Sequence, residues 1–102
     1  MECDEEFEVE RTVRWEHQSG SVGQSKTITL EVLVVVREDS DRGYFEFNDK
    51  DGGDEFYTEG GLWFRNNELI DYDGIFSLPI FVLDALEECG YDVKDMRRVL
   101  TQ

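Results

Sequence analysis

The aspartates between residues 49 and 54 are the first group in this chain whose types and spacing could do chemistry. Asp49, Asp51 and Gly53 have the alternation that starts a calcium-binding loop, in which carboxylates supply hard oxygen ligands. The glycine, however, stands one position too early, and Gly60 occupies the place of the bidentate glutamate that ends such a loop. An acidic turn closed by Asx hydrogen bonds is the better interpretation, and no metal site is predicted.

Two further groups could support catalysis, but neither has the partners it needs. Asp71 and Asp73 alternate with Tyr72 and could present two carboxylates on one strand face for acid–base work. Nothing in the sequence indicates a pocket that would push their pKa values apart. His17 is the only histidine, and no serine is paired with a plausible His–Asp set. Since no glycine-rich phosphate loop occurs either, we expect a protein that is not an enzyme and has no cofactor.

The strongest signal in the sequence is its charge. Against 10 basic residues it has 25 acidic ones, a formal net charge of −15. The acids concentrate in residues 2–10, 38–59 and 68–95, where few basic residues accompany them. Binding to DNA, RNA or an anionic membrane surface requires clustered Lys and Arg, so we expect none of these as a direct partner.

The composition still predicts a folded protein. With 39% hydrophobic and 13% aromatic residues, the chain has enough apolar surface for a core. We expect a single domain over residues 1–102, with a frayed acidic N-terminus over residues 1–6. Cys3 and Cys89 form no CxxC pair, which predicts two free thiols in a reducing compartment. No signal-peptide pattern or long apolar run occurs, so the expected location is the cytoplasm.

The hydrophobic pattern places strands first and helices after them. Apolar residues alternate with polar ones, most clearly over residues 7–17 and 26–37, and shorter strand patterns follow over 44–47, 55–64 and 68–72. Helical spacing then begins after Ser77, the expected N-cap, and ends at Gly90, with a second short helix over residues 93–100. This order predicts an α+β fold, an antiparallel meander of four or five strands followed by one or two C-terminal helices packed on one face. The expected helix–sheet contacts join Val82, Leu83 and Leu86 to Leu30, Val32, Val34, Trp63 and Phe64.

The acidic surface has two interpretations. One is a solvated exterior that keeps a small protein soluble. The other is a surface that competes for a basic groove. Carboxylates at i and i+2 on a strand lie about 7 Å apart. This is close to the axial rise of two phosphates along one DNA strand, at roughly 3.4 Å each.

In its small size, charge, lack of a catalytic motif and α+β layout, the chain resembles small phage-encoded inhibitors of bacterial defence, such as anti-CRISPR proteins and DNA mimics. The acidic runs Glu2–Glu10 and Asp49–Glu59 carry most of this resemblance. It implies an inhibitor that binds a basic, nucleic-acid-handling protein in the host cytoplasm and blocks its DNA or RNA site.

We expect the partner contacts at acidic residues in the predicted turns and strand ends. The leading candidates are followed by a second group from neighbouring turns: Asp49, Asp51, Asp54, Glu55 and Glu59, then Asp39, Asp41, Asp71 and Asp73. Two other functions stay open. One is a general interaction module with an exposed aromatic patch around Tyr57, Trp63 or Tyr72, and the other is a weak divalent-metal-binding protein. Whether the carboxylates converge on one face distinguishes the first function from mere solubility.

Overall fold

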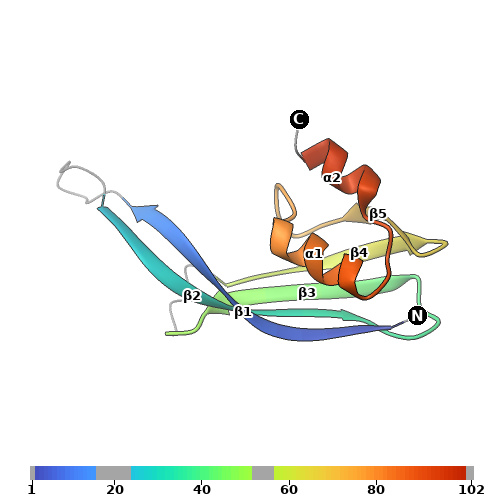
Figure 1. Cartoon of the computed structure of the whole chain (residues 1–102), viewed down its shortest axis with the longest axis horizontal. Helices are drawn as coiled ribbons and strands as arrows, with labels where there is room; N and C mark the ends of the chain where they lie inside the picture. Colours follow the sequence, from blue (N-terminus) through green and yellow to red (C-terminus); the bar gives the residue numbers. More distant parts are fainter. Residues whose placement is uncertain (1, 16–23, 52–56, 101–102) are drawn as a thin grey trace.

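The computed structural model, which describes residues 2–15, 24–51 and 57–100, is a five-stranded antiparallel sheet followed by two helices (Figure 1). The strands lie side by side in chain order, so the sheet is a meander, and the predicted α+β layout is confirmed. The elements are β1 (Cys3–Trp15), β2 (Gln24–Val36), β3 (Arg42–Asp49), β4 (Thr58–Arg65), β5 (Glu68–Tyr72), α1 (Ile80–Glu88) and α2 (Lys94–Leu100).

The β1–β2 pair is the longest part of the sheet. Its register runs from Cys3 opposite Val36 to Trp15 opposite Gln24 without a break. β1 therefore includes residues 3–6, which the acidic composition had predicted to fray. They are ordered because β2 pairs with them and because the Cys3 side chain is buried in the core.

The core lies on one face of β2 and against α1. Alternate residues of β2 from Ile28 to Val36 are buried, as the period-two pattern predicted. Val82, Leu83 and Leu86 of α1 belong to the same buried cluster, and the ring of Phe81 meets that of Phe47 edge-on at 5.4 Å. Of the sheet residues expected to contact α1, all but Trp63 belong to this cluster: Leu30, Val32, Val34 and Phe64.

Trp63 lies outside the core cluster. In β4 the two residues beside it, Leu62 and Phe64, are both buried, so the alternation of the strand directs Trp63 to the opposite face. There its ring covers Gly61: a Cβ added to that glycine would lie 2.8 Å from the indole. Trp63 was therefore wrongly assigned to the helix contact.

The start and end of α1 differ in how well the sequence predicted them. Pro79 occupies the N-cap position in place of the expected Ser77, and no side chain caps the helix there. At the other end Gly90 has a φ of 99°, and the N–H of Tyr91 donates to the carbonyl of Leu86 at 3.0 Å. This is a Schellman motif, which confirms the predicted role of Gly90. The Tyr91 ring then contacts Phe64 at 4.7 Å and closes this end of the helix.

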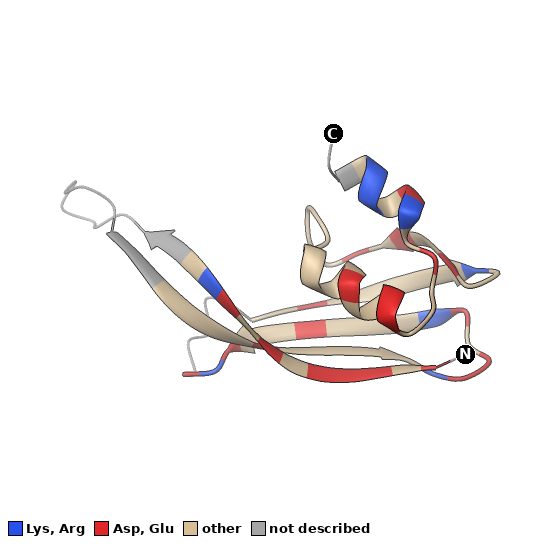
Figure 2. Ribbon diagram, in the orientation of Figure 1, with Lys and Arg blue, Asp and Glu red and all other residues tan. Residues whose placement is uncertain are grey.

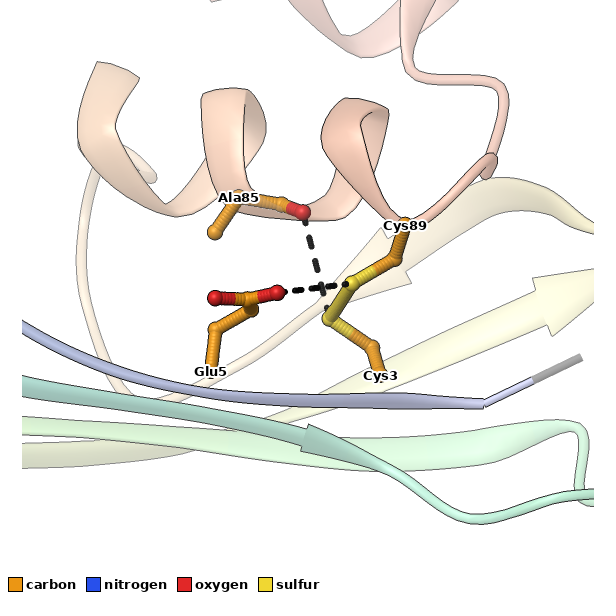
Figure 3. Close-up of a disulfide and its surroundings, with 4 residues drawn as sticks. All are labelled: Cys3, Glu5, Ala85 and Cys89. Atoms are coloured by element: carbon orange, nitrogen blue, oxygen red, sulfur yellow. Dashed lines mark hydrogen bonds between the residues drawn. A yellow bond between two sulfur atoms is a disulfide. The ribbon is translucent and has the colours of Figure 1, made fainter.

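A disulfide joins Cys3 at the start of β1 to Cys89 at the end of α1 (Figure 3). The expectation of two free thiols is wrong. The two residues are 86 positions apart in sequence, so only the fold brings their Cα atoms to 5.5 Å. The bond lies against the backbone carbonyl of Ala85 and the carboxylate of Glu5, whose Oε1 lies 3.8 Å from the Cys89 sulfur.

Within the described part of the chain, no helix is long and apolar enough to cross a bilayer.

Candidate binding site: an acidic sheet face

The strand register assigns most of the sheet's carboxylates to one face. Residues directly opposite each other on neighbouring strands share a face, and the buried alternate residues of β2 mark the face toward the core. The intervening residues of the five strands therefore form the other face, which we call the acidic face. Figure 2 shows where Asp and Glu lie along the strands. The carboxylates of the acidic face, all at least partly exposed, belong to Asp4, Glu6, Glu8, Glu10, Glu31, Glu46, Glu59 and Asp71.

These carboxylates form rows in two directions. Along β1, Asp4, Glu6, Glu8 and Glu10 recur at every second residue, which spaces them about 7 Å apart. Across the sheet, neighbouring strands are about 4.8 Å apart. The acidic face is thus a two-dimensional array of mostly negative charge, to which every strand contributes, and Arg42 of β3 lies on it opposite Trp63.

Two pairs of glutamates stand directly opposite each other in the array. Glu8 of β1 faces Glu31 of β2, and Glu46 of β3 faces Glu59 of β4. Like charges at directly opposed positions destabilise a sheet. A surface that served solubility alone would intersperse charges of both signs and avoid this cost. The two pairs are therefore the feature of the face that solubility explains least.

Lys50 partly compensates one corner of the array. Its Nζ donates to Oε1 of Glu8 at 2.7 Å. This hydrogen bond is the largest cause of the raised pKa of Lys50, and the charges of Glu8, Glu31 and Asp51 add to it. The ammonium is therefore held in its charged form beside the Glu8–Glu31 pair. The Glu46–Glu59 pair receives a different partner.

Tyr57 interacts with the second glutamate pair. Its hydroxyl donates to Oε2 of Glu59 at 2.9 Å. That hydrogen bond is the main cause of the raised pKa of Tyr57, followed by burial and by the charges of Glu59 and Glu46. A neutral phenol orients one carboxylate without cancelling its charge, so this part of the face stays negative.

A shallow hollow lies at the β4 side of the face. It has a volume of about 370 Å³ and is lined by Tyr44, Phe45, Glu59, Gly60, Gly61 and Asp73. Asp73 takes part in the local backbone structure, because its Oδ1 accepts the N–H of Gly61 at 2.7 Å. Asp71 similarly accepts the N–H of Tyr72 through its Oδ1 at 2.9 Å. Each of the two carboxylates therefore accepts a backbone N–H, Asp73 from the neighbouring strand β4 and Asp71 from the next residue of the chain.

The structure separates the sequence-predicted site residues into groups. Glu59 and Asp71 lie on the acidic face, and Asp73 borders it at the hollow. Asp51 follows β3 and is exposed. Asp49, in contrast, is 6% exposed, and its Oδ1 accepts the N–H of Asp51 at 2.9 Å, as in an Asx turn.

The remaining predicted residues lie elsewhere or cannot be placed. Asp39 and Asp41 are in the β2–β3 turn, at the opposite end of the sheet from the turn that follows β3. The carbonyl of Asp41 accepts the N–H of Phe64 at 2.8 Å there. Asp54 and Glu55 lie outside the described residues, as does His17.

The site prediction left out most of the acidic face. It did not select the β1 acids, Glu31 or Glu46, because it favoured turns over strands. A signal was present in the sequence. Glu6, Glu8 and Glu10 occupy alternate positions of a strand pattern, which by itself places them on one face. What the sequence did not contain was the register that sets other strands' glutamates beside them.

The aromatic residues of the alternative function do not form one patch. Tyr57 is 51% exposed, and Trp63 lies on the acidic face. Tyr72 packs against the core on the other face, and its hydroxyl donates to the carbonyl of Phe76 at 3.2 Å. As for the third function, the described residues contain no group of three His, Cys, Asp or Glu side chains arranged to hold a metal ion.

In comparisons with known proteins, no family model, curated protein or solved structure matches this chain. Its function therefore has to be argued from its own geometry and charge.

Proposed function

We propose that this chain is a non-enzymatic binding protein whose acidic face occupies a basic, nucleic-acid-binding groove of a partner protein. The observation that carries the proposal is the direct opposition of Glu46 and Glu59, and of Glu8 and Glu31 beside Lys50, inside a wider array of carboxylates. Such contacts oppose folding, and a cationic partner would convert the same repulsion into binding energy. Carboxylates about 7 Å apart along β1 have a spacing close to the axial rise of two phosphates on one DNA strand, at roughly 3.4 Å each.

The proposal includes the position of both helices on the core face, so that the acidic face stays uncovered. Support comes from contacts of each helix. The disulfide and the Phe47–Phe81 ring contact hold α1 over the core residues. Arg97 of α2 pairs with Asp84 of α1 at 2.6 Å, which keeps α2 beside α1. In Figure 1 both helices lie above the same side of the sheet.

The partner that fits this surface is a nucleic-acid-handling host protein, as it is for the phage-encoded inhibitors that the chain resembles. In the host cytoplasm, the location that we propose, disulfides are usually kept reduced. The acidic face does not include Cys3 or Cys89, so binding should not require the bond. Charge attraction of this kind increases the association rate and weakens with salt.

A capture experiment with matched variants tests the proposal. The immobilised chain is exposed to a bacterial lysate at about 50 mM and about 500 mM salt, and duplex DNA is added as a competitor. The Glu46→Gln/Glu59→Gln variant removes one like-charged pair, whereas Glu2→Gln/Glu38→Gln removes the same charge from exposed positions outside the array. We expect the chain to capture nucleic-acid-binding proteins at low salt, to lose them at high salt and to release them when duplex DNA is added. The amount captured should fall for Glu46→Gln/Glu59→Gln and stay unchanged for Glu2→Gln/Glu38→Gln.

Capture that DNA does not displace, or that both variants reduce equally, would contradict the proposal. The first result would show that the bound surface of the partner is not its nucleic-acid site. The second would show that only total charge matters, which is the solubility interpretation.

A further inference from the structure

The strand register shows which backbone N–H and C=O groups of β1 point away from β2, toward the outer edge of the sheet. The N–H of Lys50 donates to the carbonyl of Thr29 at 2.9 Å, so the backbone groups of Thr29 point toward β3. In an antiparallel strand the N–H and C=O of successive residues point to alternate sides. Even-numbered residues of β2 therefore bond to β1, where their register partners are odd-numbered. The even-numbered residues of β1 direct their N–H and C=O groups away from the sheet.

These outward-directed residues are the acidic ones. Asp4, Glu6, Glu8 and Glu10 combine a free backbone donor and acceptor with a carboxylate on the acidic face. Within the described ranges, β1 ends the strand order and no other segment pairs with its outer edge. The opposite edge is different, because the N–H of Leu69 in β5 donates to the carbonyl of Asp92 at 2.9 Å. β1 is therefore the edge at which an additional strand has room to pair.

On the other side of β1, an apolar groove separates the strand from α1. It has a volume of about 230 Å³, and half-buried Phe7 and Val9 form its β1 wall. Phe81 and Ala85 line it from α1, and the carboxylates of Glu5, Asp84 and Glu88 border it. A strand added at this edge would place every second side chain in the groove and the others beside the acidic face.

A second copy of this chain is a poor occupant of the edge. Two β1 strands paired antiparallel would bring Asp4, Glu6, Glu8 and Glu10 of one copy beside the same residues of the other, and like charges on facing strands repel. Charged residues on an edge strand are a known protection against such self-association. The same charges attract a strand whose corresponding side chains are basic.

We infer that β1 binds an extended segment of the partner by strand addition, in which Lys or Arg residues alternate with apolar ones. This inference rests on the proposed function and specifies how the partner is engaged. The basic side chains lie beside the β1 carboxylates, and the apolar side chains enter the groove between Phe7, Val9 and Phe81. Backbone hydrogen bonds to the outward groups of β1 supply affinity that charge alone does not.

The test compares two substitutions that remove the same charge. Glu6→Gln keeps the outward N–H of residue 6, and Glu6→Pro removes it without removing a bond to β2, a position at which edge strands tolerate proline. The probe is a decapeptide of alternating Lys and Val, and the control peptide has the same composition in two blocks. We expect Glu6→Pro to bind the alternating peptide about tenfold more weakly than Glu6→Gln, as measured by titration calorimetry.

Thermal unfolding establishes that both variants are folded. If Glu6→Pro does not fold, Thr12→Pro and Thr12→Val form a second pair on the same edge with no change of charge. Equal affinity of a folded proline variant and its control overturns strand addition, as does equal binding of the two peptides. If both peptides then still bind more weakly to Glu46→Gln/Glu59→Gln, the acidic-face proposal survives and strand addition alone fails.

Discussion

At the scale of single residues, the glutamates of the sheet contribute more through their positions than through their number. Glu46 and Glu59 lie on different strands, thirteen positions apart in sequence, and stand directly opposite each other. Tyr57 donates to Glu59 without neutralising it. Neither glutamate has a basic partner among the described ion pairs. The pair therefore opposes folding while it adds to the negative potential of the acidic face.

The first prediction concerns this repulsion. We expect Glu46→Gln/Glu59→Gln to raise the thermal unfolding midpoint by about 2–4 °C at low salt, because the substitutions remove a directly opposed like-charged pair. The gain should shrink in 1 M salt, where charge interactions are screened. Differential scanning calorimetry measures the midpoint. A gain no larger than that of Glu2→Gln/Glu38→Gln would show that the pair has no special cost.

At the scale of elements, α2 is held by contacts of opposite character. On one side Arg97 pairs with Asp84 and, at 3.4 Å, with Glu87 of α1. On the other side acidic residues meet acidic residues. The Asp95 carboxyl raises the pKa of Glu68 in β5, first by a hydrogen bond and then by its charge, and burial and Asp92 contribute further. The junction of β5 and α2 therefore holds a proton at Glu68 more tightly than the unfolded chain does.

The sign of the resulting pH dependence follows from the direction of this shift. A raised pKa in the folded state means that the stabilising contribution of Glu68 is fully present below its ordinary pKa of 4.5 and is lost as the pH rises through the raised value. We expect the junction to tighten on acidification from pH 7 toward this range. The protection of the Leu69 and Arg97 amides against hydrogen exchange measures it, since both donate to backbone carbonyls at this junction and in α2.

Glu68→Gln should increase that protection at pH 7 and abolish its pH dependence. Glu88→Gln, at an exposed position of α1, is the matched control and should change neither quantity. An unchanged pH dependence in Glu68→Gln would mean that another group controls the junction.

At the scale of the whole molecule, the disulfide joins the first strand of an elongated fold to the end of its first helix. The principal extents are 51 × 29 × 19 Å, and the long β1–β2 pair extends well beyond the helices in Figure 1. Cys3–Cys89 encloses most of the chain in one covalent loop, because the bonded residues are 86 positions apart in sequence. Because β1 is an edge strand, this bond also fixes the start of that edge to the end of α1.

Reduction of the bond should lower the free energy of unfolding by about 4–5 kcal/mol if loop-closure entropy dominates. Urea titration with and without dithiothreitol measures the change, and Cys3→Ser/Cys89→Ser should reproduce it without reductant. We expect the reduced protein to keep its salt-sensitive binding, because neither cysteine belongs to the acidic face. Equal unfolding midpoints in both redox states would show that the bond adds no stability.

The sequence determined much of the local structure, for reasons that act over short distances. Period-two alternation from Ile28 to Val36 predicted the central strand, and the left-handed backbone available to glycine predicted the end of α1 at Gly90. Two predictions about single residues were wrong. The helix begins after Pro79 and not after Ser77, and the alternation of β4, which the contact prediction did not apply, turns Trp63 away from the core.

Only the tertiary structure decided which acidic residues lie opposite each other and that the two cysteines form a disulfide. The net charge of −15 and the alternating glutamates of β1 were legible in the sequence. The opposition of Glu8 to Glu31 and of Glu46 to Glu59 was not, because strand register depends on how the buried faces of several strands pack at once. The pairing of Cys3 with Cys89 likewise required the sheet to bring the start of β1 beneath the end of α1. Composition thus determined that this protein is acidic, and register determined that its charge forms a surface.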